Sequence, residues 1–347
     1  MFKIPQETPL FPYLKTISAP IFIYGMGNGA EKLKLELDEA KIPLSGVFAS
    51  DEFVRGHSFL GHKVIKYSEL PKDAVILLAF GSFLPEMLER FDKMAAEHPF
   101  FAPDLPLFGD ERFCHETLLE KESEAAAAFE LLADEQSKLV FKNTLLHKIS
   151  GKISYLREIE TPKSEVYEQI LRLGESEHYL DLGAYDGDTV REVLSYTNGN
   201  FASITALEPD PKNFKKLLQK TPQARCLNKG VYSFSGEIAF STEASRNSSV
   251  SAAGKRTIEV DTIDNIVGDS PVSYIKMDVE GSEREALLGG KNIIRKQRPK
   301  LLISAYHKMW DIFELINLLH SIEPSYKIFL RHQPYVPNWE TNIIAIP

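Results

Sequence analysis

Acidic residues gather in one glycine-rich stretch of the C-terminal half. Residues 179–189 read Tyr-Leu-Asp-Leu-Gly-Ala-Tyr-Asp-Gly-Asp-Thr: an apolar run that ends on an acid, a glycine turn, and the start of a helical segment. This order builds a nucleotide pocket in open α/β sheets, because glycine lets the backbone approach a ligand closely. The stretch holds three acidic residues and no lysine, so it is a poor cradle for phosphate. It favours a cationic ligand rich in hydroxyl groups.

Another acidic residue, Glu208, directly follows the apolar segment 204–207, about 25 residues after the glycine turn. A carboxylate at this place can accept hydrogen bonds from both hydroxyls of an adenosine ribose. The alternative is that Glu208 only caps the helix that starts near Pro211. We favour the ribose interpretation because the acid closes a strand.

Two further apolar segments, 274–277 and 301–305, also end in polar residues. Asp278 and Glu280 follow the first, and His307 follows the second. Because ligands bind at the carboxyl ends of parallel strands, we expect these side chains beside the acids at 181 and 208. With a near-neutral pKa, His307 is a candidate general base.

Two alternatives remain open for this group of side chains. The acids can be incidental to a helix capped by Ser282, and a lone histidine often has only a structural role. Asp278, Glu280 and His307 also offer the mixed oxygen and nitrogen donors of a divalent metal site. We rank this below a site without metal.

A predominantly parallel sheet with alternating helices must position these residues. The predicted strands of the C-terminal half are 178–182, 204–207, 224–227, 237–240, 257–260, 273–277, 300–305, 326–330 and 341–346, and the predicted helices are 189–196, 211–219, 283–289 and 310–322. A loop rich in Ser, Ala and Gly, 245–254, is either a flexible connection or a lid over the site.

The N-terminal half predicts a smaller α/β domain. Its strands are 21–24, 44–49 and 74–80 and its helices 31–40 and 85–96, too few strands for a complete dinucleotide fold. Gly25 to Ala30 nevertheless resembles a dinucleotide fingerprint, with Asp51 about 20 residues further on. An NAD(P)-dependent oxidoreductase is therefore one alternative function.

The segments of the C-terminal half, taken together, resemble the FkbM family of S-adenosyl-L-methionine-dependent methyltransferases, with a Rossmann-like class I fold. The resemblance covers roughly residues 175–347 and is carried by 179–189, Leu207-Glu-Pro-Asp210, Asn228-Lys-Gly-Val231, Val260-Asp-Thr-Ile-Asp264 and Ile275-Lys-Met-Asp-Val-Glu-Gly-Ser-Glu283. It implies S-adenosyl-L-methionine as cofactor and O-methylation of a small molecule, sugar or glycan. A non-catalytic cofactor-binding or scaffold protein is the alternative.

The resemblance also assigns roles by position. The methionine and ribose part would be lined by Asp181, Gly183, Ala184, Asp186 and Gly187, the ribose held by Glu208, and the adenine flanked by Lys229, Gly230 and Val231. Asp278 would stand near the transferred methyl. His307, Asp278 or Glu280 would polarise the acceptor hydroxyl.

Composition and length set the remaining expectations. The 347 residues carry a net charge of -9, so we expect a small-molecule or carbohydrate acceptor and no nucleic acid as partner. Two cysteines, no long apolar run and an N-terminus with two prolines indicate no disulfide, no membrane span and no signal peptide, hence a cytoplasmic protein. We predict a Rossmann-like domain at 1–109, a helical linker at 110–173 and the methyltransferase domain at 174–347. The linker needs a packing partner, either a neighbouring domain or a second subunit of a homodimer.

Overall fold

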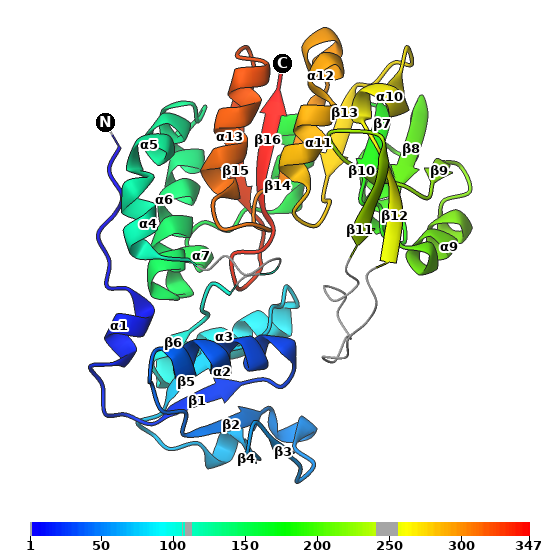
Figure 1. Ribbon diagram of the computed structural model, residues 1–347. Helices are drawn as coiled ribbons and strands as arrows, with labels where there is room; N and C mark the ends of the chain where they lie inside the picture. The colour runs from blue at the N-terminus through cyan, green and yellow to red at the C-terminus, as the bar shows by residue number, and fades with distance from the viewer. Residues whose placement is uncertain (1, 106, 108–112, 241–255) are drawn as a thin grey trace.

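The structure is a computed structural model that describes residues 2–105, 107, 113–240 and 256–347. The predicted lid segment 245–254 lies outside these residues. Figure 1 shows a smaller α/β unit, blue to cyan, below a larger one, green to red. This arrangement confirms the predicted fold class, a Rossmann-like α/β domain preceded by a smaller one.

The smaller sheet has the strand order β3-β4-β2-β1-β5-β6. All its strand pairs are parallel except β3 with β4. Its elements are α1 Leu10–Leu14, β1 Ile21–Tyr24, α2 Asn28–Glu39, β2 Gly46–Ala49, η1 Asp51–Phe53, β3 Ser58–Phe59, β4 His62–Lys66, η2 Tyr67–Glu69, β5 Val75–Leu78, α3 Pro85–Glu97 and β6 Phe100–Phe101.

This sheet has more strands than the sequence indicated. Apolar runs predicted three strands, whereas the described part of the domain contains a six-stranded sheet, so the expectation of too few strands is wrong. β3 and β6 have two residues each, and β4 has Val64 as its one buried residue. Strands this short or this exposed leave no apolar pattern to detect.

The larger sheet has the order β15-β16-β14-β13-β7-β8-β9, and only β16 runs antiparallel to its neighbours. A second small sheet, β10-β12-β11, lies beside it. The elements are β7 His178–Leu182, α8 Asp188–Tyr196, β8 Ser203–Leu207, α9 Pro211–Lys220, β9 Arg225–Leu227, β10 Gly230–Val231, β11 Gly236–Phe240, β12 Arg256–Asp261, α10 Ile263–Val267, β13 Tyr274–Met277, α11 Glu283–Gly289, α12 Lys291–Gln297, β14 Lys300–Ser304, α13 Asp311–Ile322, β15 Lys327–His332 and β16 Thr341–Ile346.

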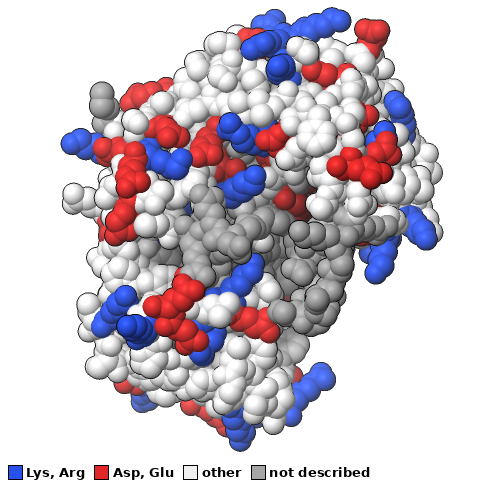
Figure 2. Space-filling view, viewed as in Figure 1, with Lys and Arg blue, Asp and Glu red and all other residues white. Residues whose placement is uncertain are grey.

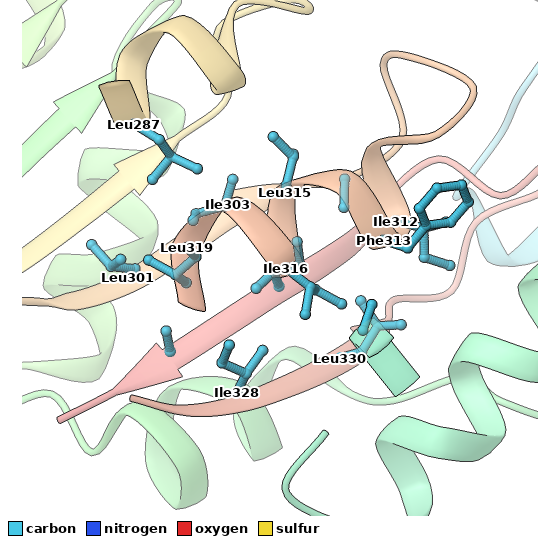
Figure 3. Packing of buried hydrophobic residues seen from close by; sticks show 14 of the residues in the cluster. Leu287, Leu301, Ile303, Ile312, Phe313, Leu315, Ile316, Leu319, Ile328 and Leu330 are labelled. Atoms are coloured by element: carbon cyan, nitrogen blue, oxygen red, sulfur yellow. The ribbon is translucent and has the colours of Figure 1, made fainter. Parts of the chain in front are cut away.

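Side chains of the larger sheet alternate between two cores, as the period of a strand requires. In β7, Leu180 and Leu182 pack in the core that also includes residues of α10 to α13, while Tyr179 packs with residues of α8 and α9 on the other face. Figure 3 shows α13 lying across the sheet, with Leu315, Ile316 and Leu319 near Leu301, Ile303, Ile328 and Leu330.

The helical block in the middle of the chain consists of α4 His115–Glu120, α5 Glu122–Glu130, α6 Glu135–Ser150, α7 Ser154–Arg157 and the π-helix η3 Glu165–Leu171. α5 packs on α13 and α6 packs on β15. Two hydrogen bonds fix this contact, from the N–H of Ala133 to the carbonyl of Ile328 at 2.8 Å and from the N–H of Leu330 to Oγ of Ser137 at 3.0 Å. The apolar face of the block is therefore covered by the neighbouring domain.

The two α/β units also touch directly. Ser82, beyond β5, exchanges two backbone hydrogen bonds of 2.9 and 3.1 Å with Val336, which lies between β15 and β16. The buried ion pair of Lys148 with Asp104, at 2.7 Å, adds a contact near the end of the smaller unit. The carboxyl end of β5 therefore faces the carboxyl side of the larger sheet.

Three general expectations can be compared with the described residues. Cys114 and Cys226 are free thiols, as predicted. None of the helices in the described ranges has the length and apolar character that a membrane crossing needs. On the face shown in Figure 2, Lys and Arg are interspersed with Asp and Glu rather than collected in one basic area.

Candidate functional site

The candidate site lies where the order of the larger sheet reverses, between β7 and β13. The chain passes from β7 to β8 on one side and returns to β13 on the other. At such a point two turns diverge and leave room for a ligand at the carboxyl ends of the strands. We call the residues that follow β7, β8, β13 and β14 the carboxyl edge.

Gly183 and Asp278 bring the two turns into backbone contact. The N–H of Asp278 donates to the carbonyl of Leu182 at 2.9 Å. Gly183 has a φ of +82°, and a Cβ built on it would lie 1.8 Å from the carbonyl oxygen of Asp278. Only glycine fits this position, because both the left-handed backbone and the close approach exclude a side chain.

Asp181 lies beneath the turn and not on its surface. Its side chain is fully buried, Oδ2 accepts a hydrogen bond of 2.5 Å from Thr189, and Oδ1 lies 3.8 Å from Nζ of Lys276. Burial raises the pKa of this carboxyl, and Lys276 only partly opposes the rise. In the structure Asp181 supports the turn from within, and its role of lining a ligand stays a prediction.

Lys276 is the residue that the sequence interpretation passed over. Its side chain is 9% exposed, and Nζ lies 3.5 Å from Oδ2 of Asp278 and 3.4 Å from the carbonyl of Gly183. Burial alone would lower the pKa of Lys276, but Asp278 and Asp181 outweigh burial and raise it. The lysine therefore stays charged and joins the β7 and β13 turns. A lysine inside an apolar strand was the available signal, since buried lysines need acidic partners.

Glu208 is placed as the sequence predicted, at the end of β8 beside the Gly183 turn. Its oxygens accept hydrogen bonds from the N–H groups of Tyr185, at 2.9 Å, and Asp210, at 2.8 Å. Burial raises its pKa to about 7, although both bonds act in the opposite direction. Each carboxylate oxygen can accept a second hydrogen bond, so the group can still hold ligand hydroxyls.

Three other predicted cofactor residues, Ala184, Asp186 and Gly187, lie in the β7 turn. Ala184 and Gly187 shape the turn: the N–H of Ala184 bonds to Leu207 at 2.8 Å and that of Gly187 to Ala184 at 2.7 Å. Asp186 instead pairs with Arg191 and Lys220, so its charge is already balanced by the protein.

The predicted adenine residues lie on β10 and just before it. Lys229 turns toward β12, with Nζ at 2.6 Å from Glu259 and 3.5 Å from Asp261. Gly230 and Val231 are buried, and their strand pairs with β12. These two residues can form a wall beside Glu208, whose carbonyl accepts a bond of 2.8 Å from Asn228.

His307 is buried among carboxylates. Nδ1 lies 2.8 Å from Oε1 of Glu283, and Nε2 lies 3.4 Å from Oδ1 of Asp278 and 3.5 Å from Oε2 of Glu280. Burial would lower the pKa of this imidazole, but Glu283, Asp278 and Glu280 outweigh burial and raise it to about 10. The expected near-neutral pKa is therefore wrong, because Glu283 was taken only as the start of a helix.

A protonated His307 cannot accept a proton, so it contributes a positive charge that keeps the Asp278 carboxylate ionised. Burial alone would raise the pKa of Asp278, yet Lys276 and His307 bring it below its usual value. Asp278 therefore remains a carboxylate, with its side chain 29% exposed at the edge. The geometry gives Asp278 the role of accepting a hydrogen bond from a ligand.

The protonation of His307 predicts a specific loss of stability at alkaline pH. Its folded pKa of about 10 lies above the ordinary value of 6.5, so the stabilisation is complete below pH 6.5 and is lost as the pH rises through 10. Between pH 7 and pH 10 the wild type should lose on the order of 3 kcal/mol relative to His307→Gln in urea unfolding. His320→Gln is the control and should follow the wild type. If the free energies of unfolding of the wild type and His307→Gln change with pH in parallel, His307 is neutral.

The structure indicates a different set of candidate metal ligands from the set that the sequence predicted. Asp278, Glu283 and His307, rather than Asp278, Glu280 and His307, offer donor atoms within 4.8 Å of one another. Oε1 of Glu283 is already shared between His307 and the N–H of Val279, at 2.8 and 2.9 Å. A divalent metal would have to replace the proton of His307 and these hydrogen bonds, and the ranking of a site without metal above a metal site stays a prediction.

The N-terminal glycine turn is built for packing. A Cβ on Gly29 would lie 2.0 Å from the carbonyl of Ala79, and one on Gly25 would lie 2.6 Å from the ring of Phe80. Asp51, the expected ribose acid, accepts a hydrogen bond from the N–H of Ser68 at 3.3 Å. These contacts give the glycines a role without any nucleotide.

Comparisons with known proteins agree with the geometry of the carboxyl edge. Residues 181–327 match the family model described as the methyltransferase FkbM domain. The match covers less than half of the chain, so this segment is similar to FkbM methyltransferase domains. The matched segment spans the β7 turn, the β13 turn and His307.

One solved structure extends the similarity of fold to both units. The methyltransferase FkbM from Methylobacillus flagellatus KT matches with a TM-score of 0.71 at 23% identity, over 94% of this chain and 90% of its own. Fibrillarin from Aeropyrum pernix, solved with bound S-adenosyl-L-methionine, has a TM-score of 0.34 at 13% identity, over 53% of this chain and 73% of its own. No curated protein matches the sequence.

Proposed function

We propose that the protein transfers the methyl group of S-adenosyl-L-methionine to a hydroxyl group of a small molecule or carbohydrate. The observation that carries this proposal is the buried Glu208 carboxylate beside the Gly183 turn, in the segment that is similar to FkbM methyltransferase domains. A ribose needs such a bidentate acceptor. The carboxylates of the edge suit a cofactor with a sulfonium and an ammonium group.

The protein's own task in this reaction is to bind, orient and exclude water. When bound, S-adenosyl-L-methionine supplies an activated methyl group on a sulfonium. Glu208 accepts hydrogen bonds from the ribose hydroxyls, and Gly183 lets the β7 and β13 turns meet closely enough to form the site. Asp278 orients the acceptor hydroxyl in line with the methyl, which makes the encounter effectively intramolecular. Glu280, with its side chain 58% exposed, offers the acceptor proton a way to solvent.

Calorimetry with S-adenosyl-L-methionine tests the binding step, and release of S-adenosylhomocysteine in the presence of acceptors tests the transfer. We expect binding with one site per chain. Lack of binding would overturn the proposal, and binding without transfer to any hydroxyl compound would support a non-catalytic protein instead. Titration with NADH in the same instrument tests the oxidoreductase alternative.

Cofactor affinity should depend on the ionisation of Glu208. Because its pKa is about 7, the carboxylate form falls from about 90% at pH 8 to about 10% at pH 6, and affinity should fall about tenfold. Glu208→Gln should bind the cofactor roughly 10- to 100-fold more weakly and without this pH dependence. Calorimetry at three pH values measures both effects. Glu168→Gln, an exposed acid on η3, is the control; equal affinities for Glu208→Gln and the wild type would remove Glu208 from the site.

A further inference from the structure

The connection between β15 and β16, residues 333–340, joins the smaller unit to the carboxyl edge. Figure 1 shows it on the side of the larger sheet that faces the smaller one. On the side of the smaller unit, Gly81 packs directly on this connection. A Cβ on Gly81 would lie 2.4 Å from Cζ3 of Trp339 and 2.7 Å from Cε1 of Tyr335. Gly81 therefore fixes where the indole of Trp339 lies.

The other end of the same connection brings Glu340 to the carboxyl edge. Thr341 follows it, and its carbonyl accepts a hydrogen bond of 2.9 Å from the N–H of Ala305. The next residue of that segment, Tyr306, places its hydroxyl 3.5 Å from Oδ1 of Asp278. Burial raises the pKa of Glu340, and the charge of Asp278 raises it further. Glu340 therefore directly precedes β16 at the carboxyl edge, opposite the segment that carries Tyr306.

The backbone of Glu340 is held in an unfavourable conformation. Its φ is +63°, in the left-handed region, as are Tyr185 at +46° and Glu280 at +53°. A residue in this region is strained and persists only where the surrounding structure determines its conformation. Tyr185 follows β7, Glu280 follows β13 and Glu340 precedes β16, so all three lie at the carboxyl edge. The fold therefore holds these side chains at one edge at an energetic cost.

We propose that Glu340 binds the methyl acceptor beside Asp278, and that the smaller unit positions Glu340 through the contact of Gly81 with Trp339. This inference rests on the proposed function and assigns its acceptor site. It gives the smaller unit a role that needs no nucleotide, namely to position the residue that binds the methyl acceptor.

The charges around this position select the class of acceptor. Asp278 and Glu280 lie 3.4 and 3.5 Å from Nε2 of His307, and Glu340 directly precedes β16 at the same edge. The cations Lys276, His307 and Lys163 are already paired with carboxylates. Carboxylates accept hydrogen bonds from hydroxyl groups and repel anions. A neutral polyhydroxylated acceptor, such as a glycoside, is therefore favoured over a uronate. Phe83, which is 54% exposed and 5.9 Å from the ring of Tyr335, offers an apolar surface nearby.

The first test compares Glu340→Gln and Glu340→Asp with the wild type. The probes are neutral aryl glycosides and the matching uronides, with methyl transfer and the cofactor Kd measured for each. We expect transfer to neutral glycosides only, a KM for them at least tenfold higher in Glu340→Gln, a smaller rise in Glu340→Asp, and an unchanged cofactor Kd. An unchanged KM in Glu340→Gln, preference for uronides, or no transfer to any neutral glycoside would overturn the assignment.

The second test addresses the positioning role. Gly81→Ala should raise the acceptor KM at least tenfold with an unchanged cofactor Kd, since the new methyl displaces Trp339. Gly174→Ala, where no atom lies within 4 Å of the added Cβ, is the matched control. In a Trp310→Phe background Trp339 is the single tryptophan, so its emission should shift in Gly81→Ala. A shifted emission with unchanged KM would overturn the positioning role. Failure of the wild type to bind S-adenosyl-L-methionine would count against the proposed function instead.

Discussion

Replacing Gly183 with alanine should abolish cofactor binding and destabilise the fold. The added Cβ would lie 1.8 Å from the carbonyl oxygen of Asp278, which is backbone and cannot rotate away, and the φ of +82° already disfavours any side chain. The β7 and β13 turns must then separate. We expect a loss of about 3–5 kcal/mol in the free energy of unfolding and at least 100-fold weaker binding of S-adenosyl-L-methionine.

Urea unfolding and calorimetry measure the two effects of Gly183→Ala. Gly174→Ala adds the same methyl group in open space and should change neither quantity by more than about 0.5 kcal/mol. A Gly183→Ala variant that binds the cofactor with normal affinity would show that the turns can separate without loss of the site. It would then place the cofactor away from the β7–β13 junction.

The sequence predicted the elements of the larger sheet because each strand there is an apolar run closed by polar residues. β7, β8, β13 and β14 start and end within a residue of the predicted bounds. β10, with two residues, and α12, whose buried residues are only Ile293 and Ile294, were missed because neither has a pattern long enough to recognise.

The sequence predicted which residues meet at the site but not which of them carry a charge. Asp278, Glu208 and His307 meet at the carboxyl edge because strand ends meet there. The protonation of His307 depends on Glu283, which lies 24 residues away in sequence. The contact of Gly81 with Trp339 joins segments still further apart. Contacts of this kind form only in the tertiary structure, so no local sequence pattern indicates them.

Lys276→Met should have the second large effect, because it removes the cation shared by the buried carboxylate of Asp181 and the partly exposed carboxylate of Asp278. Asp181 is fully buried, and its Oδ1 has Lys276 as its nearest positive charge, at 3.8 Å. Breaking a buried pair by removing one partner costs about 3–5 kcal/mol, since the other charge remains uncompensated. We expect this loss in urea unfolding at pH 7, together with loss of cofactor binding as the two turns lose their common partner.

The pH dependence of Lys276→Met then distinguishes an electrostatic cause from a packing cause. Burial already raises the pKa of Asp181, and without Lys276 it should rise further, so the variant should recover stability as the pH falls and Asp181 takes up a proton. Asp181→Asn combined with Lys276→Met should recover part of the loss at pH 7. Lys163→Met, whose partner Glu192 lies 2.7 Å away in an exposed pair, should cost no more than about 1 kcal/mol. If the double variant is as unstable as Lys276→Met alone, the lysine acts through packing of its side chain and not through its charge.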